Sequence, residues 1–226
     1  MDADGLVVSE LAAADVDAVV ITPAHQYPTG ALMTAERRSA LLAWAHQRQA
    51  LIIEDDYDVE YRFGQEPVAS LQGLAPDRVV FLGTTSKTLA PALRLAWMVP
   101  PAAMVEELES VLMITGVVPP TLDQLALASF IEDAALARYL RSMRRRYRAK
   151  REVLAELPDG ADERAIALRA RGAGVGLHEL HRHCTSRAPF PPALLLGFAL
   201  PGESDLVTAT QLLAGTVQRG ALACAP

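Results

Sequence analysis

The sequence predicts an α/β fold in which a mostly parallel sheet is flanked by helices. Apolar runs at residues 16–22, 51–53 and 78–82 are typical of strands, and each is followed by a polar turn. A segment with helical apolar spacing separates the first two runs. Strand, helix and strand at this distance form a crossover between parallel strands, which is the building unit of such a fold.

Length and composition are those of a globular protein. The chain has 226 residues, of which 51% are hydrophobic, so it is long enough for one domain or somewhat more. A formal net charge of −6 argues against non-specific nucleic-acid binding by the chain as a whole. The first residues lack the pattern of a signal peptide, and no apolar run is long enough to span a membrane. We therefore expect a soluble, cytoplasmic protein.

The predicted sheet lies in the first part of the chain. The continuous apolar run Val16–Thr22 predicts a strand that is covered on both faces. Thr34 is expected to cap a helix that ends near Gln49. The buried stripe of this helix comprises Leu41, Leu42, Trp44 and Ala45. The elements expected next are the strand Leu51–Ile53 followed by EDDYD, the strand Arg78–Leu82, the strand Leu95–Val99 and a helix from Pro100 to about Met113.

The expected domains are a large domain at 1–133, a long connecting helix at 134–157 and a shortened small α+β domain at 158–226. The elements expected here are the helices Thr121–Glu132, Ala134–Leu157 and about Glu203–Arg219, and the strands Val175–Leu180 and Leu194–Ala199. Residues 158–187 carry the weakest pattern, and GAGVG at 172–176 is interpreted as a turn.

The connecting helix is strongly basic. Its arginines lie between apolar residues that keep helical spacing, namely Leu136, Tyr139, Leu140, Met143 and Tyr147. A basic helix fits a nucleic acid or a membrane surface, but no recognition motif accompanies these charges, so a solvated face is the preferred interpretation. The spacing of His178, His181 and His183 matches no common zinc pattern, so no metal site is predicted.

The segment GTTSKTLAPALRLAWMV, residues 83–99, concentrates reactive side chains. Lys87 follows the hydroxyl residues Thr84, Thr85 and Ser86 at the end of a predicted strand, and Arg94 comes seven positions later. Hydroxyls and a guanidinium are suitable donors for a phosphate. A lysine that is desolvated or flanked by cations becomes a nucleophile toward carbonyl groups, although a surface lysine is the simpler alternative.

A second set of polar residues follows the predicted strand at 51–53. A carboxylate at Asp55 is suited to protonate a ring nitrogen, and the phenol of Tyr57 is suited to bind a ring oxygen. Each residue also has a structural interpretation, Asp55 as a helix cap, Tyr57 as packing and Gly30 as a turn residue. Since ligands of parallel sheets bind at the carboxyl ends of strands, these residues and Lys87 are expected to meet. A lysine imine, a ring-nitrogen acid and a phosphate cup together describe a site for pyridoxal 5′-phosphate.

Two parts of the sequence resemble known families. SKTLAPALRLAW resembles the lysine segment of fold-type I, class I/II aminotransferases. IIEDDYDVEYRF and TPAHQYPTG are similar to the aminotransferase-like domain of MocR/GabR-type regulators, a GntR subgroup with a winged-helix DNA-binding domain ahead of it. In this variant Tyr27 stands where ordinary aminotransferases carry an asparagine that contacts the ring. The resemblance covers residues 16–99 most closely and returns at LLLGFALPGESDL.

The resemblance implies a role for each candidate residue. Lys87 would form the internal aldimine and shuttle a proton, Asp55 would pair with the pyridinium nitrogen, and Tyr57 would bind the ring oxygen O3′. Thr84 and Arg94 would bind the phosphate, with Ser86 as a neighbour and Tyr27 beside the ring. It further implies a homodimer, an amine or amino-acid ligand, and DNA binding only through a winged helix that this chain lacks.

This sequence also departs from the family pattern. We expect an N-terminally truncated chain, because the family's domain is longer and its upstream strand and phosphate loop have no counterpart here. The substrate-carboxylate arginine is missing from FPPALLLGFA, and Arg187 is the nearest candidate. Two main functions stay open: an effector-sensing regulator domain, or an active aminotransferase that completes its site with a partner chain. A degenerate chain that folds poorly is a third.

Overall fold

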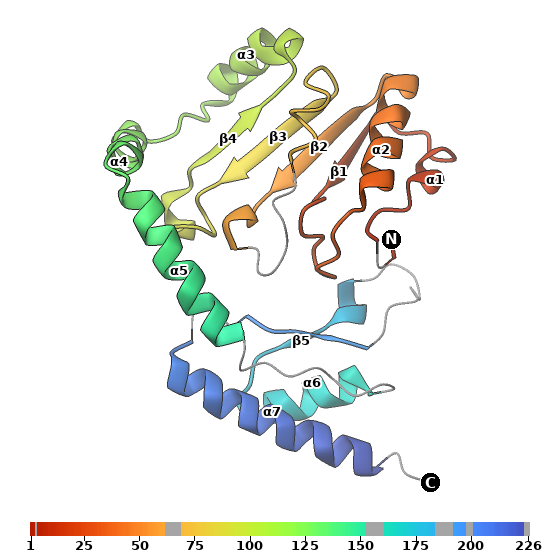
Figure 1. Ribbon diagram of the computed structural model, residues 1–226, viewed down its shortest axis with the longest axis vertical. Coiled ribbons are helices and arrows are strands. Elements are labelled where there is room, and N and C mark those ends of the chain that lie inside the picture. The colour runs from red at the N-terminus through yellow and green to blue at the C-terminus, as the bar shows by residue number, and fades with distance from the viewer. Residues whose placement is uncertain (3, 62–68, 152–160, 184–191, 198–200, 224–226) are drawn as a thin grey trace. The chain divides into compact units, whose positions relative to one another are not determined.

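The computed structural model describes residues 1–2, 4–61, 69–151, 161–183, 192–197 and 201–223. The chain divides into two compact units, Met1–Arg141 and Ser142–Pro226 (Figure 1). Arg187 lies outside the described residues.

The first unit is built on a four-stranded sheet in the order β1-β2-β3-β4. Its strands are β1 (Ala18–Ile21), β2 (Leu51–Asp56), β3 (Val79–Thr84) and β4 (Ala96–Val99). β1 pairs with β2 and β2 with β3 in parallel, whereas β4 runs antiparallel to β3. The predicted α/β fold with a mostly parallel sheet is therefore confirmed.

Helix α2 (Ala35–Arg48) covers one face of this sheet (Figure 1). As predicted, Thr34 is its N-cap, and the Thr34 hydroxyl accepts a hydrogen bond of 3.4 Å from the backbone N–H of Arg37. The predicted stripe is buried at Leu41, Trp44 and Ala45 and partly buried at Leu42. It packs with Ile52 of β2 and Val79 of β3 in one apolar cluster. The short helix α1 (Val8–Leu11) packs beside α2.

The prediction that the first strand is covered on both faces is wrong. Ile21 is 3% exposed, but Val20, which points to the other side of the sheet, is 66% exposed. β1 is an edge strand, and the described residues cover it only on the side of α2. An uninterrupted apolar run therefore marks a strand here without showing how many of its faces are buried.

The other elements of the first unit follow the predicted order with shifted ends. They are the 3₁₀ helices Val59–Tyr61, Pro91–Leu93 and Ala102–Met104, and the helices α3 (Val105–Thr115), α4 (Thr121–Glu132) and α5 (Ala135–Arg151), which continues into the second unit. β2 is longer than predicted, so Asp55 lies inside the strand and not just past it. Along α5 the predicted apolar positions are partly buried, while Arg138, Arg141 and Arg148 are exposed, as expected for a solvated basic face.

The second unit contains α6 (Glu163–Gly172), a two-stranded antiparallel sheet of β5 (His178–Glu179) and β6 (Leu194–Leu195), and α7 (Glu203–Ala223). Helix α6 was not predicted, although Asp162 caps it by accepting a hydrogen bond of 2.9 Å from the backbone N–H of Ala165. The predicted strand Val175–Leu180 is shorter, because it begins only at His178 and a 3₁₀ helix follows from Leu180.

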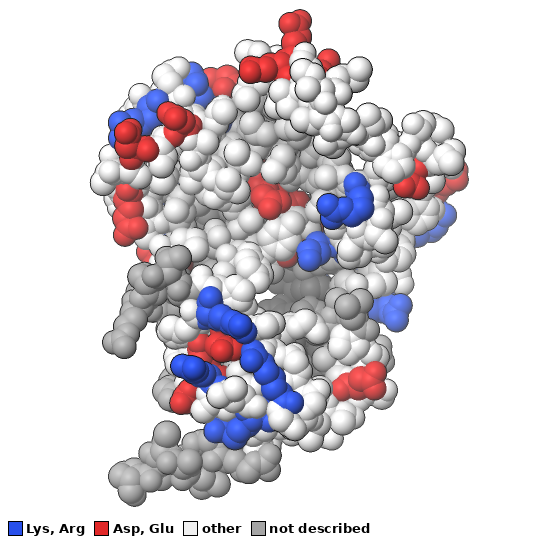
Figure 2. Space-filling view, turned by 180° about the vertical axis from the view of Figure 1, so that it is seen from behind, with Lys and Arg blue, Asp and Glu red and all other residues white. Residues whose placement is uncertain are grey.

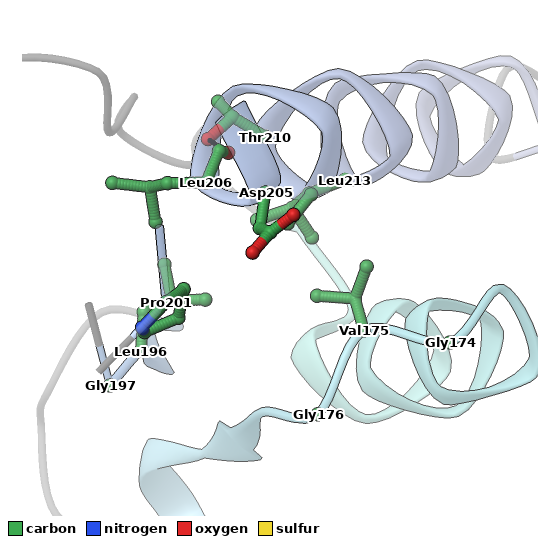
Figure 3. A pocket seen from close by; sticks show the side chains of 11 residues that line it. Gly174, Val175, Gly176, Leu196, Gly197, Pro201, Asp205, Leu206, Thr210 and Leu213 are labelled. Carbon is green, nitrogen blue, oxygen red and sulfur yellow. Dashed lines mark hydrogen bonds between the residues drawn. The ribbon is translucent and has the colours of Figure 1, made fainter. Parts of the chain in front are cut away.

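The segment GAGVG forms the turn that was predicted. It begins at the last residue of α6, and Gly174 adopts φ 86°, which favours glycine. The turn carries Val175 toward α7, and the side chains of Val175, Asp205 and Leu213 face the same hollow of about 250 Å³ (Figure 3). The hollow thus lies between the turn after α6, the segment after β6 and the first half of α7.

The described helices include none that combines the length and the apolar character needed to cross a bilayer.

Candidate functional site

Asp55 and Thr84 project from the same face of the sheet. Asp55 of β2 lies opposite Leu82 of β3, and Thr84 is two residues further along β3. Side chains two residues apart on a strand point to the same side, so the carboxylate and the hydroxyl share one face. This face is opposite to the one covered by α2, since Ile52 of β2 packs with that helix and Glu54 bonds the loop that precedes β3.

A pocket of about 520 Å³ opens on this face, within the first unit. Asp55 and Thr84 line it together with Trp97 and Met98 of β4, and α3 contributes Leu108 and further apolar side chains. Its walls are therefore mainly apolar, and their charged and hydroxyl groups come from Asp55, Glu109 and Thr84. Such a lining suits a flat ring that carries a few polar groups.

The Asp55 carboxylate fits a cationic ligand. It is half-buried, and it makes no hydrogen bond or ion pair with any other residue that the structure describes. Burial, and then the neighbouring charge of Asp58, raise the pKa of the Asp55 carboxyl above its ordinary value. A carboxylate in this state is stabilised by a cation placed beside it, and a protonated pyridine nitrogen is a cation of suitable shape.

Tyr57 lies next to the end of β2 and contacts the loop that follows β1. Its hydroxyl donates a hydrogen bond of 3.1 Å to the backbone carbonyl of His25. The two rings stack, with centroids 6.3 Å apart and an angle of 17° between their planes. The side chain of Asp58 in turn bonds His25 Nδ1. Burial and the nearby carboxylates of Asp58 and Asp55 raise the pKa of the Tyr57 phenol, so the phenol stays protonated and acts as a donor.

Lys87 lies in a helical turn just after β3. The turn is closed by a hydrogen bond of 2.8 Å from Leu89 N to the carbonyl of Thr85, and the Thr85 hydroxyl donates to the carbonyl of Leu95 over 3.0 Å. From the segment after β2, the Tyr61 hydroxyl donates to the carbonyl of Thr88 over 3.0 Å. Lys87 itself is exposed, so the desolvation expected from the sequence is not observed in this chain.

The predicted phosphate ligands lie around the same turn. The Thr84 hydroxyl is 3.0 Å from the Ser86 hydroxyl and accepts a hydrogen bond of 3.1 Å from Ser86 N. Arg94 is exposed and has φ 51°, a left-handed conformation that is uncommon for a side-chain-bearing residue. Tyr27 is 55% exposed on the loop after β1. Of the predicted site residues, only Asp55 and Thr84 line the pocket at β2, β3 and β4.

Sequence reasoning missed His25, Asp58 and Trp97 as neighbours of the site. His25 and Asp58 stand 33 residues apart, and neither belongs to a short spacing pattern. Their proximity could have been predicted from the order of the strands. His25 follows β1 and Asp58 follows β2, and the carboxyl ends of two paired parallel strands lie at the same edge of the sheet.

A separate charged cluster lies in the second unit, where basic side chains gather around acidic ones (Figure 2). Arg171 contacts Glu179 at 3.4 Å and donates to the carbonyl of Leu177 at 3.1 Å. Glu163 is buried and accepts from the backbone N–H groups of His181 and Ala193 at 2.8 and 2.6 Å. Within the described residues no group of three or more metal-binding side chains is arranged to hold an ion, the histidines included.

Comparisons with known proteins place this chain in a family. A sequence model described as aminotransferase class I and II matches residues 2–166. An uncharacterized HTH-type transcriptional regulator, YhdI of Bacillus subtilis, is 41% identical over 182 residues, which are 80% of this chain and 38% of that protein. The probable rhizopine catabolism regulatory protein MocR of Rhizobium meliloti is 42% identical over 140 residues, 62% of this chain and 28% of that protein. The chain thus spans well under half the length of these relatives.

A solved structure shows the same fold. The kynurenine aminotransferase of Pyrococcus horikoshii superposes with a TM-score of 0.82 at 24% identity, over 97% of this chain and 62% of that one. At this identity the likeness concerns the fold, whereas the sequence model covers most of the chain. The chain therefore belongs to the family of class I and II aminotransferases, whose cofactor is pyridoxal 5′-phosphate.

Proposed function

We propose that the chain is the pyridoxal-phosphate-binding, effector-sensing domain of a MocR-type transcriptional regulator of the GntR family. The two regulators support this proposal because they match the chain over most of its length. The segments TPAHQYPTG and IIEDDYDVEYRF support it as well, because their sequences are similar to those of that subgroup. DNA binding would then belong to a winged-helix domain outside this sequence.

The half-buried Asp55 carboxylate, which shares a pocket with Thr84, is the observation that carries the cofactor assignment. The residues assigned to the cofactor are Lys87 for covalent attachment, Asp55 for the ring nitrogen, Tyr57 for the ring oxygen, Thr84, Ser86 and Arg94 for the phosphate, and Tyr27 beside the ring. When bound, the cofactor supplies an electrophilic carbon that captures primary amines, which makes an amine or an amino acid the expected effector class.

The second candidate function is an active aminotransferase that moves amino groups between an amino acid and a 2-oxo acid. It is favoured because Asp55, Tyr57, Lys87 and Arg94 are all present. The exposure of Lys87 and Arg94 fits a site that a second copy of the chain completes in a homodimer. Sedimentation of the purified chain with and without pyridoxal phosphate tests the homodimer.

Covalent capture of pyridoxal phosphate tests the cofactor assignment. The chain has only two lysines, Lys87 and Lys150, so Lys150→Ala is a matched control. After borohydride reduction, mass spectrometry is expected to find one cofactor adduct in the wild type and in Lys150→Ala, and none in Lys87→Ala. If the wild type and Lys87→Ala both give the absorbance spectrum of free pyridoxal phosphate, the assignment is wrong.

An assay with amino donors and 2-oxo acids then separates the two functions. A sensing domain is expected to bind amines and change its spectrum without sustained turnover. Robust turnover that disappears in Lys87→Ala would establish the aminotransferase instead.

A further inference from the structure

Three contacts join the loop after β1 to the segment after β2. Asp58 bonds the ring of His25, the ring of His25 stacks on Tyr57, and the Tyr57 hydroxyl donates to the main-chain carbonyl of His25. His25 therefore contacts Tyr57 through both its ring and its backbone. The Tyr57 ring is held from one side by a residue that is itself held by Asp58.

We propose that His25 and Asp58 are positioning residues that hold the phenol of Tyr57 in place to bind the ring oxygen of pyridoxal phosphate. The inference rests on the proposed function, which gives Tyr57 that role. Neither His25 nor Asp58 contacts the cofactor in this proposal, and both act through Tyr57.

The order of the contacts determines the role of each residue. An imidazole ring turns freely unless one nitrogen is bonded, and a carboxylate on Nδ1 fixes both its orientation and its tautomer. Once fixed, the ring of His25 is a flat support at the stacking distance of aromatic pairs. Asp58 thus orients His25, and His25 orients Tyr57.

The hydrogen bond to the His25 carbonyl is compatible with this role. A phenol has one proton, and the Tyr57 hydroxyl gives it to that carbonyl in the present structure. The O–H bond rotates about the C–O axis, so the proton can pass to another acceptor while the ring stays where His25 holds it. The stack rather than the hydrogen bond therefore has to persist when the cofactor binds.

A double-mutant cycle distinguishes positioning from simple anchoring of the loop. We expect His25→Ala and Asp58→Ala to weaken pyridoxal phosphate binding by about fivefold, the size of effect that one hydrogen bond has on an equilibrium. In a Tyr57→Phe background the same changes are expected to alter affinity by less than about twofold, because the hydroxyl they position is gone. Equal losses in both backgrounds would show that the pair only anchors the loop, and the proposal would be wrong.

Two further variants serve as controls for the double-mutant cycle. Asp58→Asn removes the charge but keeps an acceptor for the imidazole N–H, so it is expected to recover most of the affinity lost in Asp58→Ala. His46 and Asp77 form a similar pair, 3.6 Å apart and exposed, away from the pocket lining. Asp77→Ala is therefore the matched control and is expected to leave the affinity unchanged.

A measurement without cofactor keeps this proposal separate from the proposed function. The NMR signal of the Tyr57 ring, assigned by its loss in Tyr57→Phe, is expected to shift and broaden in His25→Ala but not in Asp77→Ala. An unchanged signal in His25→Ala overturns the proposal whether or not the protein binds pyridoxal phosphate. Failure of the proposed function is recognised instead by the missing Lys87 adduct in the wild type.

Discussion

The Tyr61 hydroxyl donates a hydrogen bond of 3.0 Å to the carbonyl of Thr88, the residue that follows Lys87. The segment after β2 therefore supports the lysine turn directly. Tyr61→Phe is expected to destabilise the fold by about 1 kcal/mol and to weaken pyridoxal phosphate binding several-fold, because the turn loses one anchor. Urea unfolding and a cofactor titration measure the two effects.

Tyr139→Phe is the matched control for this change. Within the described residues the Tyr139 hydroxyl makes no hydrogen bond, and its ring packs against Phe130. The control is expected to leave both quantities unchanged, and an equal effect of the two substitutions would contradict the role given to Tyr61.

Glu54 holds the loop that precedes β3. Its carboxylate is 3% exposed and accepts from the Ser70 hydroxyl at 2.5 Å, from Leu71 N at 3.0 Å and from Gln72 N at 3.1 Å. Glu54→Gln puts an amide NH₂ against one of these donors, so we expect a loss of about 2 kcal/mol in the free energy of unfolding. Glu132→Gln on exposed α4 should change it by less than about 0.5 kcal/mol. If Glu54→Gln leaves the free energy of unfolding unchanged, the role given to the Glu54 carboxylate is wrong.

Gly83 leaves room for the indole of Trp97 on the neighbouring strand. The two residues lie opposite each other, and a Cβ at position 83 would overlap the ring. Gly83→Ala is expected to cost about 1–3 kcal/mol of stability, as overpacking does, and to displace the ring of Trp97. In a Trp97→Ala background the same substitution should cost much less. Additive losses in the urea-unfolding cycle would exclude this contact as the cause.

The raised pKa of the Asp55 carboxyl makes stability depend on pH in a definite direction. Because the folded state raises this pKa through burial, the folded chain binds the proton more readily than the unfolded chain does. The ionised carboxylate therefore destabilises the fold above its raised pKa, and the effect vanishes below the ordinary value of 3.8. Without cofactor, Asp55→Asn is expected to be more stable than the wild type at pH 7 and equally stable near pH 3. Urea unfolding at both pH values checks the sign, and a less stable Asp55→Asn at pH 7 would refute it.

Local signals in the sequence were sufficient for the elements that depend on local physics. Thr34 caps α2, and the apolar spacing of that helix selects Leu41, Trp44 and Ala45 for the core. A capping signal is also present at α6, although no helix is predicted there from the sequence. Asp162 accepts a hydrogen bond from the backbone N–H of Ala165, three residues further on. The sequence predicts Asp55 past its strand because acidic residues are poor strand formers, whereas pairing with β3 extends β2 through it.

Local signals of this kind do not predict which distant segments contact each other. The pairing of His25 with Asp58 and of Tyr61 with the Thr88 carbonyl depends on how neighbouring strands are ordered in the sheet. The exposure of Lys87 depends likewise on which segments cover the turn, and no spacing within residues 83–99 specifies that.

The position of Trp97 gives this chain an optical reporter of its own. The only other tryptophan, Trp44, is 7% exposed in the core, whereas Trp97 is 46% exposed and is one of the residues around the pocket. A bound chromophore that absorbs indole emission would quench the fluorescence of Trp97. Occupancy can therefore be followed by light emission from the unlabelled protein, and Trp97→Phe is expected to reduce that signal to the contribution of Trp44.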